Sequence, residues 1–338
     1  MQFDSFIIFG GCGFIGTHMA RLLRELRPDA KVYIADIEAE GSEFSRFVDV
    51  RKPISMSGEF DKDTLIFNFA AIHRTPGHPD HAYFETNIRG AENVCEFARK
   101  HGIENIVFTS SIAPYGAAED LKTEDTLPTP NTPYGISKLV AEEIHREWAA
   151  ENENRRLSIV RPGIVFGTGE QGYMTRLYQA LKKHKFAYAG RKDTIKACIY
   201  VKDLVRVMLE MAENEKKVTE PAGGRSLSKA ETPTDRVQLF NCCYYPSFTI
   251  EQIANTMLKA TGMKRHIPYI PQAPMMAAAT VCGMLGGLGL GICPARVKKL
   301  MVSTNIDGQK ISQNYPLRYS LEEAFRDWFK DCGEKGLE

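Results

Sequence analysis

A glycine-rich turn between an apolar run and a helical pattern constrains this fold more than any other feature. Gly10, Gly13 and Gly16 follow the short apolar run 5–9 and precede apolar residues at helical spacing. Such glycines allow a tight turn, a close backbone approach to a pyrophosphate and close helix packing, with the helix N-terminus facing the phosphates. The pattern therefore predicts a strand, a turn and a helix that bind a dinucleotide.

An acidic residue further along the chain supports a dinucleotide site. A second apolar run, residues 32–35, ends at Asp36, twenty residues after Gly16. A carboxylate at this position binds the hydroxyls of the adenosine ribose and repels a 2′-phosphate. NAD is therefore favoured over NADP.

Strand-like and helical stretches alternate through the first half of the chain. Further strands are predicted at 44–48, 64–69, 105–109 and 157–160, and helices over 84–100 and 134–150. This alternation predicts an α/β fold with a doubly wound parallel (Rossmann) sheet. Ligands bind such sheets beyond the carboxyl ends of the strands.

The length of 338 residues suits one enzyme of two lobes. We expect an NAD-binding Rossmann domain at 1–165, with later strand and helix contributions near 196–212 and 238–262. We expect a smaller C-terminal substrate-binding lobe from 166–195 and 263–338.

Charge and cysteine content exclude several classes of protein. Lys plus Arg number 43 and Asp plus Glu 42, so no strong field is available to recruit nucleic acid. The eight cysteines are scattered, without Cys-x-x-Cys pairs or Cys/His clusters, so no metal site is expected. With no secretory signal at the start of the sequence, these features favour a cytoplasmic protein.

Tyr134 and Lys138 lie four residues apart in the predicted helix 134–150, so they project from one face. A phenol titrates near about 10, but an adjacent ammonium favours the phenolate, which suits an acid/base near neutral pH. Tyr-x-x-x-Lys also occurs by chance on solvated helices. The spacing alone leaves a catalytic pair and a surface pair open.

Seven motifs in order along the chain together resemble the extended short-chain dehydrogenase/reductase family, in its nucleotide-sugar epimerase/dehydratase group. They are the glycines at 10–16, Asp36, Phe69-Ala70-Ala71, Asn87, Thr109-Ser110-Ser111 with Tyr115-Gly116, Tyr134 with Lys138, and Arg161-Pro162-Gly163. The resemblance is strong over residues 6–210 and fainter towards the C-terminus. It favours the catalytic interpretation of Tyr134 and Lys138.

The resemblance implies a role for each matching residue. Tyr134 would be the acid/base, Ser111 would hydrogen-bond the reacting hydroxyl, and Lys138 would bind the nicotinamide ribose and favour the phenolate. The NAD would be lined by Gly10, Gly13, Phe14, Ile15, Gly16, Asp36, Asp49, Val50, Ala70, Ala71, His73, Asn87, Tyr134, Lys138 and Pro162. His73 fits a surface histidine equally well. No metal is required.

The same resemblance indicates substrate contacts beyond the first domain. Lys196 and Arg296 would reach the substrate diphosphate, although a charged surface turn is the alternative for Lys196. The glycine-rich loop 167–172 resembles the segment that receives the sugar nucleotide. Relatives often carry Asn near Ile164, where an amide contacts the diphosphate, and this departure leaves the substrate pose open.

Two later stretches have unusual composition. Residues 213–236 are polar and charged, which is typical of a surface insertion without chemistry. Residues 275–293 are nearly all apolar, with glycines at GxxxG spacing, and their length would suffice to span a bilayer. A buried or lobe-covering helical hairpin is favoured there, and membrane-surface or partner docking is the alternative.

Residues next to Ser111 narrow the reaction. Dehydratases of this group resemble one another in an Asp-Glu pair that moves protons, but Ile112-Ala113 stands here, which disfavours dehydration. No cysteine lies between Cys95 and Cys198, which weakens a reductase-epimerase of the fucose-synthase kind. Reversible oxidation of a secondary alcohol by NAD remains.

We therefore predict a 4-epimerase of a UDP-hexose or UDP-N-acetylhexosamine that acts through a 4-keto sugar. An NAD-dependent dehydrogenase or reductase of a keto-sugar or 3β-hydroxysteroid is the alternative. A non-catalytic NAD sensor is disfavoured because Tyr134 and Lys138 are both present. Helices 84–100 and 134–150 resemble those through which relatives form a homodimer.

Overall fold

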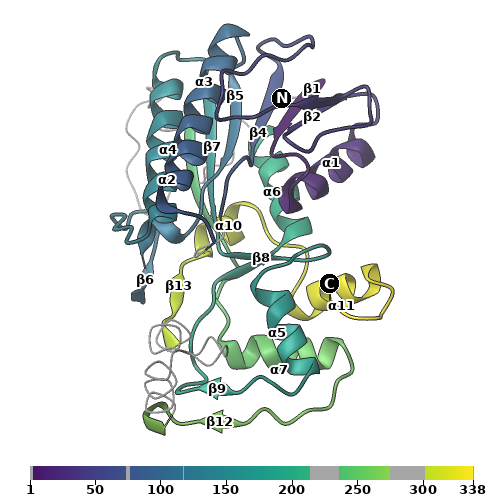
Figure 1. Ribbon diagram of the computed structural model, residues 1–338, viewed down its shortest axis with the longest axis vertical. Coiled ribbons are helices and arrows are strands. Elements are labelled where there is room, and N and C mark those ends of the chain that lie inside the picture. Colours follow the sequence, from purple (N-terminus) through teal and green to yellow (C-terminus); the bar gives the residue numbers. More distant parts are fainter. Residues whose placement is uncertain (1–2, 74–76, 117, 214–235, 275–300, 338) are drawn as a thin grey trace, which may run out of the picture.

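The computed structural model describes residues 3–73, 77–116, 118–213, 236–274 and 301–337. Its main element is a seven-stranded sheet in which neighbouring strands run parallel (Figure 1). In spatial order the strands are β11 (Val237–Cys242), β7 (Arg156–Pro162), β5 (Asn105–Thr109), β4 (Thr64–Asn68), β1 (Ser5–Phe9), β2 (Lys31–Asp36) and β3 (Ser45–Phe47). The strand order changes direction between β1 and β4, so the predicted doubly wound α/β sheet is confirmed.

Helices cover both faces of the sheet. On one face lie α1 (Phe14–Leu26) and α6 (Val201–Glu213), and on the other lie α2 (Asp80–Tyr83), the π-helical turn η1 (Phe84–Ile88), α3 (Arg89–Lys100) and α4 (Pro133–Ala150). Alternate residues of β1 point to opposite faces. Phe6 and Ile8 belong to the core under α1 and α6, whereas Ile7 and Phe9 belong to the core under α3 and α4.

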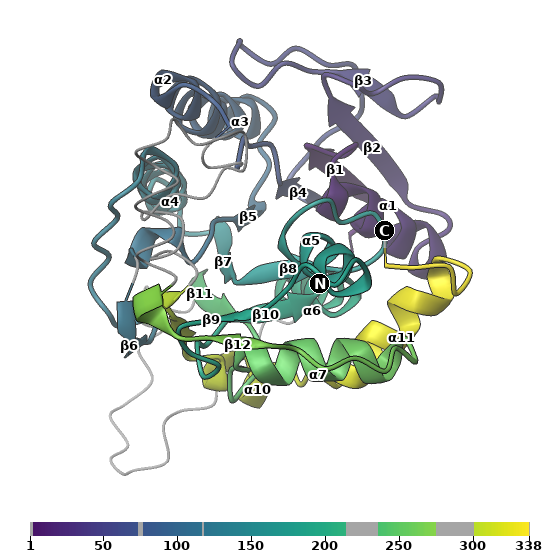
Figure 2. The same ribbon diagram turned by 60° about the horizontal axis from the view of Figure 1, so that its bottom comes forward.

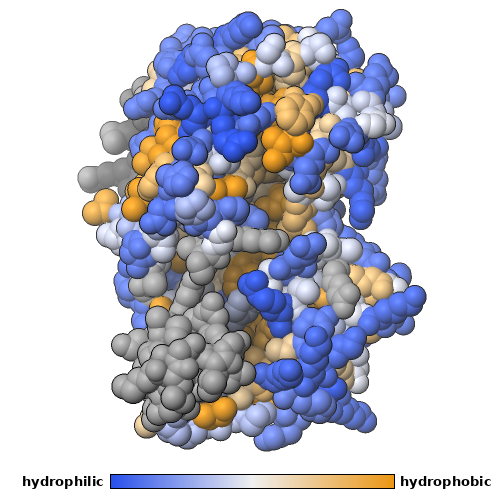
Figure 3. Space-filling view, in the orientation of Figure 1, coloured by the Kyte–Doolittle hydropathy of each residue, from blue (hydrophilic) through white to orange (hydrophobic). Residues whose placement is uncertain are grey.

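The carboxyl ends of the strands point towards a set of smaller elements. These are the 3-10 turn η2 (Ala113–Tyr115), β6 (Ala118–Lys122), β8 (Ile164–Phe166), α5 (Tyr173–Lys182), β9 (Tyr188–Ala189), β10 (Cys198–Tyr200), α7 (Ile250–Ala260), β12 (Tyr269–Ile270), β13 (Thr304–Ile306), α10 (Gln309–Asn314) and α11 (Leu321–Asp331). Two-residue to five-residue strands pair here as β8 with β10, β9 with β12 and β6 with β13. Apolar atoms are visible in the hollow between the sheet above and these elements below (Figure 3). The domain boundaries stay a prediction.

A capping box begins each of α7 and α11. The Thr249 hydroxyl accepts from the Gln252 amide at 3.2 Å, and the Gln252 side chain accepts from the Thr249 amide at 2.8 Å. Ser320 and Glu323 make the equivalent pair at the start of α11. The two helices pack their apolar faces into the same core.

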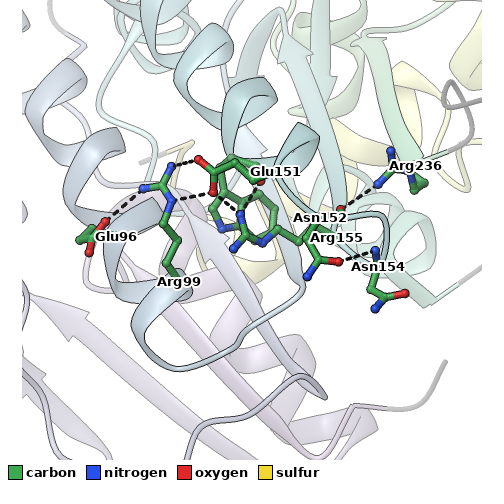
Figure 4. A network of polar contacts seen from close by, with 8 residues as sticks. Glu96, Arg99, Glu151, Asn152, Asn154, Arg155 and Arg236 are labelled. Atoms are coloured by element: carbon green, nitrogen blue, oxygen red, sulfur yellow. Dashed lines mark hydrogen bonds and ion pairs between the residues drawn. The ribbon is translucent and has the colours of Figure 1, made fainter.

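A network of polar contacts joins the carboxyl ends of α3 and α4, near the amino ends of the sheet strands (Figure 4). Arg99 of α3 donates to Glu151 at 2.7 Å, and Arg155 donates to the backbone carbonyl of Trp148 at 2.6 Å. Arg236 donates to the Asn152 carbonyl at 2.8 Å. These contacts hold α4 against the sheet at the end opposite Tyr134.

No helix among the described residues is both long and apolar enough to cross a membrane. The segments 275–293 and 214–235, for which a helical hairpin and a surface insertion were predicted, lie outside the described residues.

Candidate active site

The glycine turn lies between β1 and α1 as predicted. Gly10 has φ +76°, and a Cβ there would come within 2.7 Å of the backbone nitrogen of Ala70, so only glycine fits. Gly13 precedes α1 and contributes no side-chain cap, which leaves the first-turn amides at Phe14 and Ile15 available to an anion. This turn fits the pyrophosphate of a dinucleotide.

Asp36 and Asp49 lie at the strand ends that would face an adenosine. Asp36 accepts from the Cys12 amide at 3.0 Å, so its carboxylate lies beside the glycine turn. Asp49 forms two 2.8 Å contacts with Arg51, which lower the pKa of that carboxyl. A carboxylate can accept about four hydrogen bonds, so Asp36 can still accept from ribose hydroxyls. The positions of Asp36 and Asp49 therefore fit NAD.

Tyr134 lies in the first turn of α4. Thr132 caps this helix by accepting from the Gly135 amide at 3.1 Å, and Pro133 occupies the first helical position. Burial raises the pKa of the Tyr134 phenol, and the nearby Ser111 side chain partly opposes this effect. The cap therefore fixes the start of the helix that carries Tyr134.

Lys138 lies one turn further along α4 and is only 3% exposed. Its ammonium donates to the Thr109 carbonyl at 2.8 Å and lies 4.9 Å from the centre of the Phe108 ring. Burial lowers the pKa of Lys138 to about 7, and Glu142 opposes this effect. The expected lowering of the Tyr134 pKa by this ammonium is not seen in the protein alone.

A buried ion pair lies below Lys138, and the sequence did not indicate it. The Arg161 guanidinium donates to both Glu142 oxygens, at 2.8 and 2.6 Å, and Ser110 donates to the same carboxylate. Arg161 also lies 4.7 Å from the centre of the Tyr115 ring. Since Glu142 is fully buried and Arg161 is 3% exposed, each charge depends on the other.

Asn87 links the predicted cofactor loop to the catalytic helix. Its carbonyl oxygen accepts from the Ile72 amide at 3.0 Å, and its amide donates to the Ile72 carbonyl at 3.2 Å and the Ser137 hydroxyl at 2.9 Å. Ser137 in turn donates to the Tyr134 carbonyl at 2.9 Å. Asn87 was expected to line NAD, but both N–H groups of its side chain bind protein atoms.

The remaining predicted cofactor residues occupy strand ends. Ala70 and Ala71 directly follow β4 and are partly buried, Val50 is buried, and the Pro162 carbonyl accepts from the Ile112 amide at 3.2 Å. His73 is exposed, at the boundary of the described residues. Its role in NAD binding stays a prediction.

The predicted substrate lysine and the predicted substrate loop both contact other parts of the protein. Lys196 is 6% exposed and donates to the Val302 carbonyl at 2.7 Å, so it is not part of an exposed turn. In the loop 167–172, the Thr168 carbonyl accepts from His18 at 2.8 Å and its hydroxyl donates to Asp331 at 3.0 Å. Arg296 lies outside the described residues.

In the part of the chain that the structure describes, no cluster of His, Cys, Asp or Glu could hold a metal ion. The arrangement of Tyr134, Ser111 and Lys138 suits proton transfer at a hydroxyl beside a dinucleotide.

Comparisons with known proteins agree with this geometry. Residues 6–222 match the profile of the NAD dependent epimerase/dehydratase family. The chain is 26% identical over 332 residues to an N-acetyl-alpha-D-glucosaminyl-diphospho-ditrans,octacis-undecaprenol 4-epimerase of Escherichia coli O157:H7, covering 95% of this chain and 93% of the relative. It is also 26% identical to a decarboxylating sterol-4-alpha-carboxylate 3-dehydrogenase of Saccharomyces cerevisiae, covering 96% of each.

Solved structures share the fold. A UDP-Glc/GlcNAc 4-epimerase from Campylobacter jejuni superposes with a TM-score of 0.68 at 20% identity, covering 97% of this chain and all of that one. A UDP-glucuronic acid 4-epimerase from Bacillus cereus in complex with NAD gives a TM-score of 0.68 at 18% identity, covering 97% of this chain and 96% of that one.

Proposed function

Because the chain belongs to the NAD dependent epimerase/dehydratase family, we propose that it is an NAD-dependent 4-epimerase of a UDP-hexose or UDP-N-acetylhexosamine. The observation that carries this proposal is the position of the Tyr134 phenol near the Ser111 side chain, at the capped end of α4, with Lys138 one turn away. The Escherichia coli relative, a 4-epimerase of a diphosphate-linked N-acetylglucosamine by its name, supports the sugar and the reaction.

In the proposed mechanism, Ser111 hydrogen-bonds the C4 hydroxyl and Tyr134 removes its proton. The glycine turn and Asp36 would hold NAD, which would supply the hydride acceptor for oxidation to a 4-keto sugar and the hydride donor for the return step. Lys138, one turn further along α4, would bind the nicotinamide ribose. The keto-sugar then rotates in the site so that its opposite face is reduced, and Tyr134 returns the proton to the C4 oxygen.

One acid/base serves both directions. Ile112 and Ala113 follow Ser111 at the start of η2, and neither side chain can carry a proton. A dehydration would need a second group to protonate the leaving hydroxyl. This composition supports alcohol oxidation and re-reduction at C4 over dehydration.

The test is interconversion without added cofactor. We expect purified protein to release NAD on denaturation and to interconvert UDP-GlcNAc or UDP-Glc with its C4 epimer, as followed by NMR. Tyr134→Phe should still contain NAD that is released on denaturation, but its turnover should fall by about 10²–10⁴-fold. Full activity of this variant would remove Tyr134 from the proposed role.

An NAD-dependent dehydrogenase of a keto-sugar or 3β-hydroxysteroid is the second candidate. The Saccharomyces cerevisiae sterol dehydrogenase favours it, because that relative aligns over 96% of each chain. The two reactions differ in their demand for cofactor: a dehydrogenase consumes NAD in proportion to product, whereas an epimerase regenerates it. Stoichiometric NADH formation at 340 nm would therefore replace the epimerase proposal.

We also propose a homodimer through α3 and α4. Ile136 and Val140 lie one turn apart on α4 and are 39% and 37% exposed, which is unusual for apolar residues of a buried-core helix. Light scattering should give twice the mass of one chain, and Ile136→Asp with Val140→Asp should give a monomer. A wild-type monomer would contradict this proposal.

A cytoplasmic location and a membrane-surface association through 275–293 remain proposals. The six cysteines in the described part of the chain are free, which is the state expected in a reducing cytoplasm.

A further inference from the structure

Two segments at the end of the smaller lobe carry a strong local positive charge. Residues 182–192 contain five Lys or Arg and residues 261–274 contain two, and neither segment contains Asp or Glu. The whole chain has a formal net charge of only +1. We call these two segments the basic tip.

The two segments are joined by backbone pairing. β9 and β12 run parallel, with Tyr188 opposite Tyr269. The Tyr188 amide donates to the Pro268 carbonyl at 2.9 Å, and the Gly190 amide donates to the Ile270 carbonyl at 2.9 Å. Figures 1 and 2 show this ribbon at the end of the molecule away from the seven-stranded sheet. The two basic segments therefore lie side by side where they pair.

Much of this charge has no carboxylate partner. Arg191 and Lys192 form ion pairs with Asp193 and Glu251. Within the described residues, no ion pair is formed by Lys182, Lys183, Lys185 or Lys264, and all four are exposed. Four ammonium groups are thus available to an external anion.

The basic tip also exposes apolar side chains. Tyr269 is 48% exposed and Ile270 is 40% exposed. The chain carries no charged residue from 267 to 295. Exposed aromatic and aliphatic side chains beside lysines are typical of surfaces that bind the interface of anionic bilayers. Nucleic acid would use the charges but would leave Ile270 without a partner, so a bilayer fits better.

We propose that the basic tip docks this protein on the surface of an anionic lipid bilayer. Lys183, Lys185 and Lys264 supply the attraction to lipid phosphates, and Tyr269 and Ile270 enter the headgroup region. The proposal goes beyond the proposed reaction and does not depend on it, because none of these residues belongs to the Tyr134 site.

The test is co-sedimentation of the full chain with phosphatidylcholine vesicles that contain or lack phosphatidylserine. We expect sedimentation only with phosphatidylserine, and release in 0.5 M NaCl because salt screens surface charge. The triple variant Lys183→Gln, Lys185→Gln and Lys264→Gln should bind about 100-fold more weakly. Ile270→Ser should weaken binding roughly tenfold.

A matched variant controls for net charge. Lys62, Lys100 and Lys330 are exposed and lie outside the basic tip, so changing all three to Gln should leave vesicle binding as in the wild type. The thermal midpoints of both triple variants establish that they fold.

Several results would overturn the proposal. The wild-type protein could stay in the supernatant, or the basic-tip variant could bind vesicles as tightly as the wild type. The protein could also bind short duplex DNA more tightly than vesicles. Epimerase activity on a soluble UDP-sugar, measured in parallel, reports separately on the proposed function.

Discussion

The buried ion pair below the active site allows a quantitative test of how the catalytic helix is held. Glu142→Gln removes the carboxylate that accepts two hydrogen bonds from Arg161 and one from Ser110. The Arg161 guanidinium, which is 3% exposed, then stays buried without a counter-charge. Breaking such a pair from one side costs about 3–5 kcal/mol of unfolding free energy.

The size of the protein converts this cost to a shift in thermal midpoint. An unfolding entropy of about 2.1 cal/mol/K per residue gives roughly 0.7 kcal/mol/K for 338 residues. If the chain unfolds as one cooperative unit, Glu142→Gln should lower Tm by about 4–7 °C. Differential scanning calorimetry at pH 7 measures this shift.

Two further variants make the test decisive. Glu59→Gln removes an ion pair with Lys31 that is open to solvent, so no measurable change in Tm is expected. Glu142→Leu combined with Arg161→Met replaces both charges by apolar groups and should recover most of the loss. A Glu142→Gln shift no larger than that of Glu59→Gln, or a double variant whose loss equals the sum of its single variants, would refute the reasoning.

Three further predictions concern pH and cofactor choice. Burial lowers the pKa of His145 to about 4, below the unfolded value near 6.5. The free energy of unfolding should therefore fall by about 3 kcal/mol as pH falls from 6.5 to 4. His145→Gln should remove this part of the dependence of Tm on pH. The pKa of Lys138 is lowered to about 7, so its buried charge opposes folding most strongly below pH 7. Lys138→Met should therefore raise Tm at pH 6, and this gain should shrink towards pH 10. The same variant should lose turnover. Asp36→Ser should reduce the preference for NAD over NADP at least tenfold in a binding titration, because the repulsion of a 2′-phosphate is removed; an unchanged preference would separate Asp36 from the ribose.

The sequence predicts best those features that depend on neighbouring residues. The glycine turn at 10–16 and the capping boxes at Thr249 and Ser320 follow from local backbone geometry and hydrogen bonding, and all three are present. The strands of the sheet follow from apolar runs that are buried on both faces. Local chemistry therefore accounts for most of the Rossmann architecture.

Features that depend on tertiary packing were not predictable. Glu142 is one of several charged residues on α4, and only the approach of β7 shows that it binds Arg161. Lys196 could be read as a surface residue until the Val302 carbonyl was seen to bind it. The π-helical turn before α3, which carries Asn87, also leaves no signature in residue type.

The buried face of α4 has a consequence for how the protein is made. This face carries Lys138, Glu142 and His145 beside the apolar residues Ala141 and Trp148, so its docking buries polar groups together with apolar ones. Lys138 donates to the Thr109 carbonyl of β5, and Glu142 pairs with Arg161 of β7, which is synthesised after the helix. On the ribosome, the Glu142 carboxylate therefore has no counter-charge until Arg161 has been synthesised, so a nascent chain that stops before residue 161 lacks this one anchor of the catalytic helix.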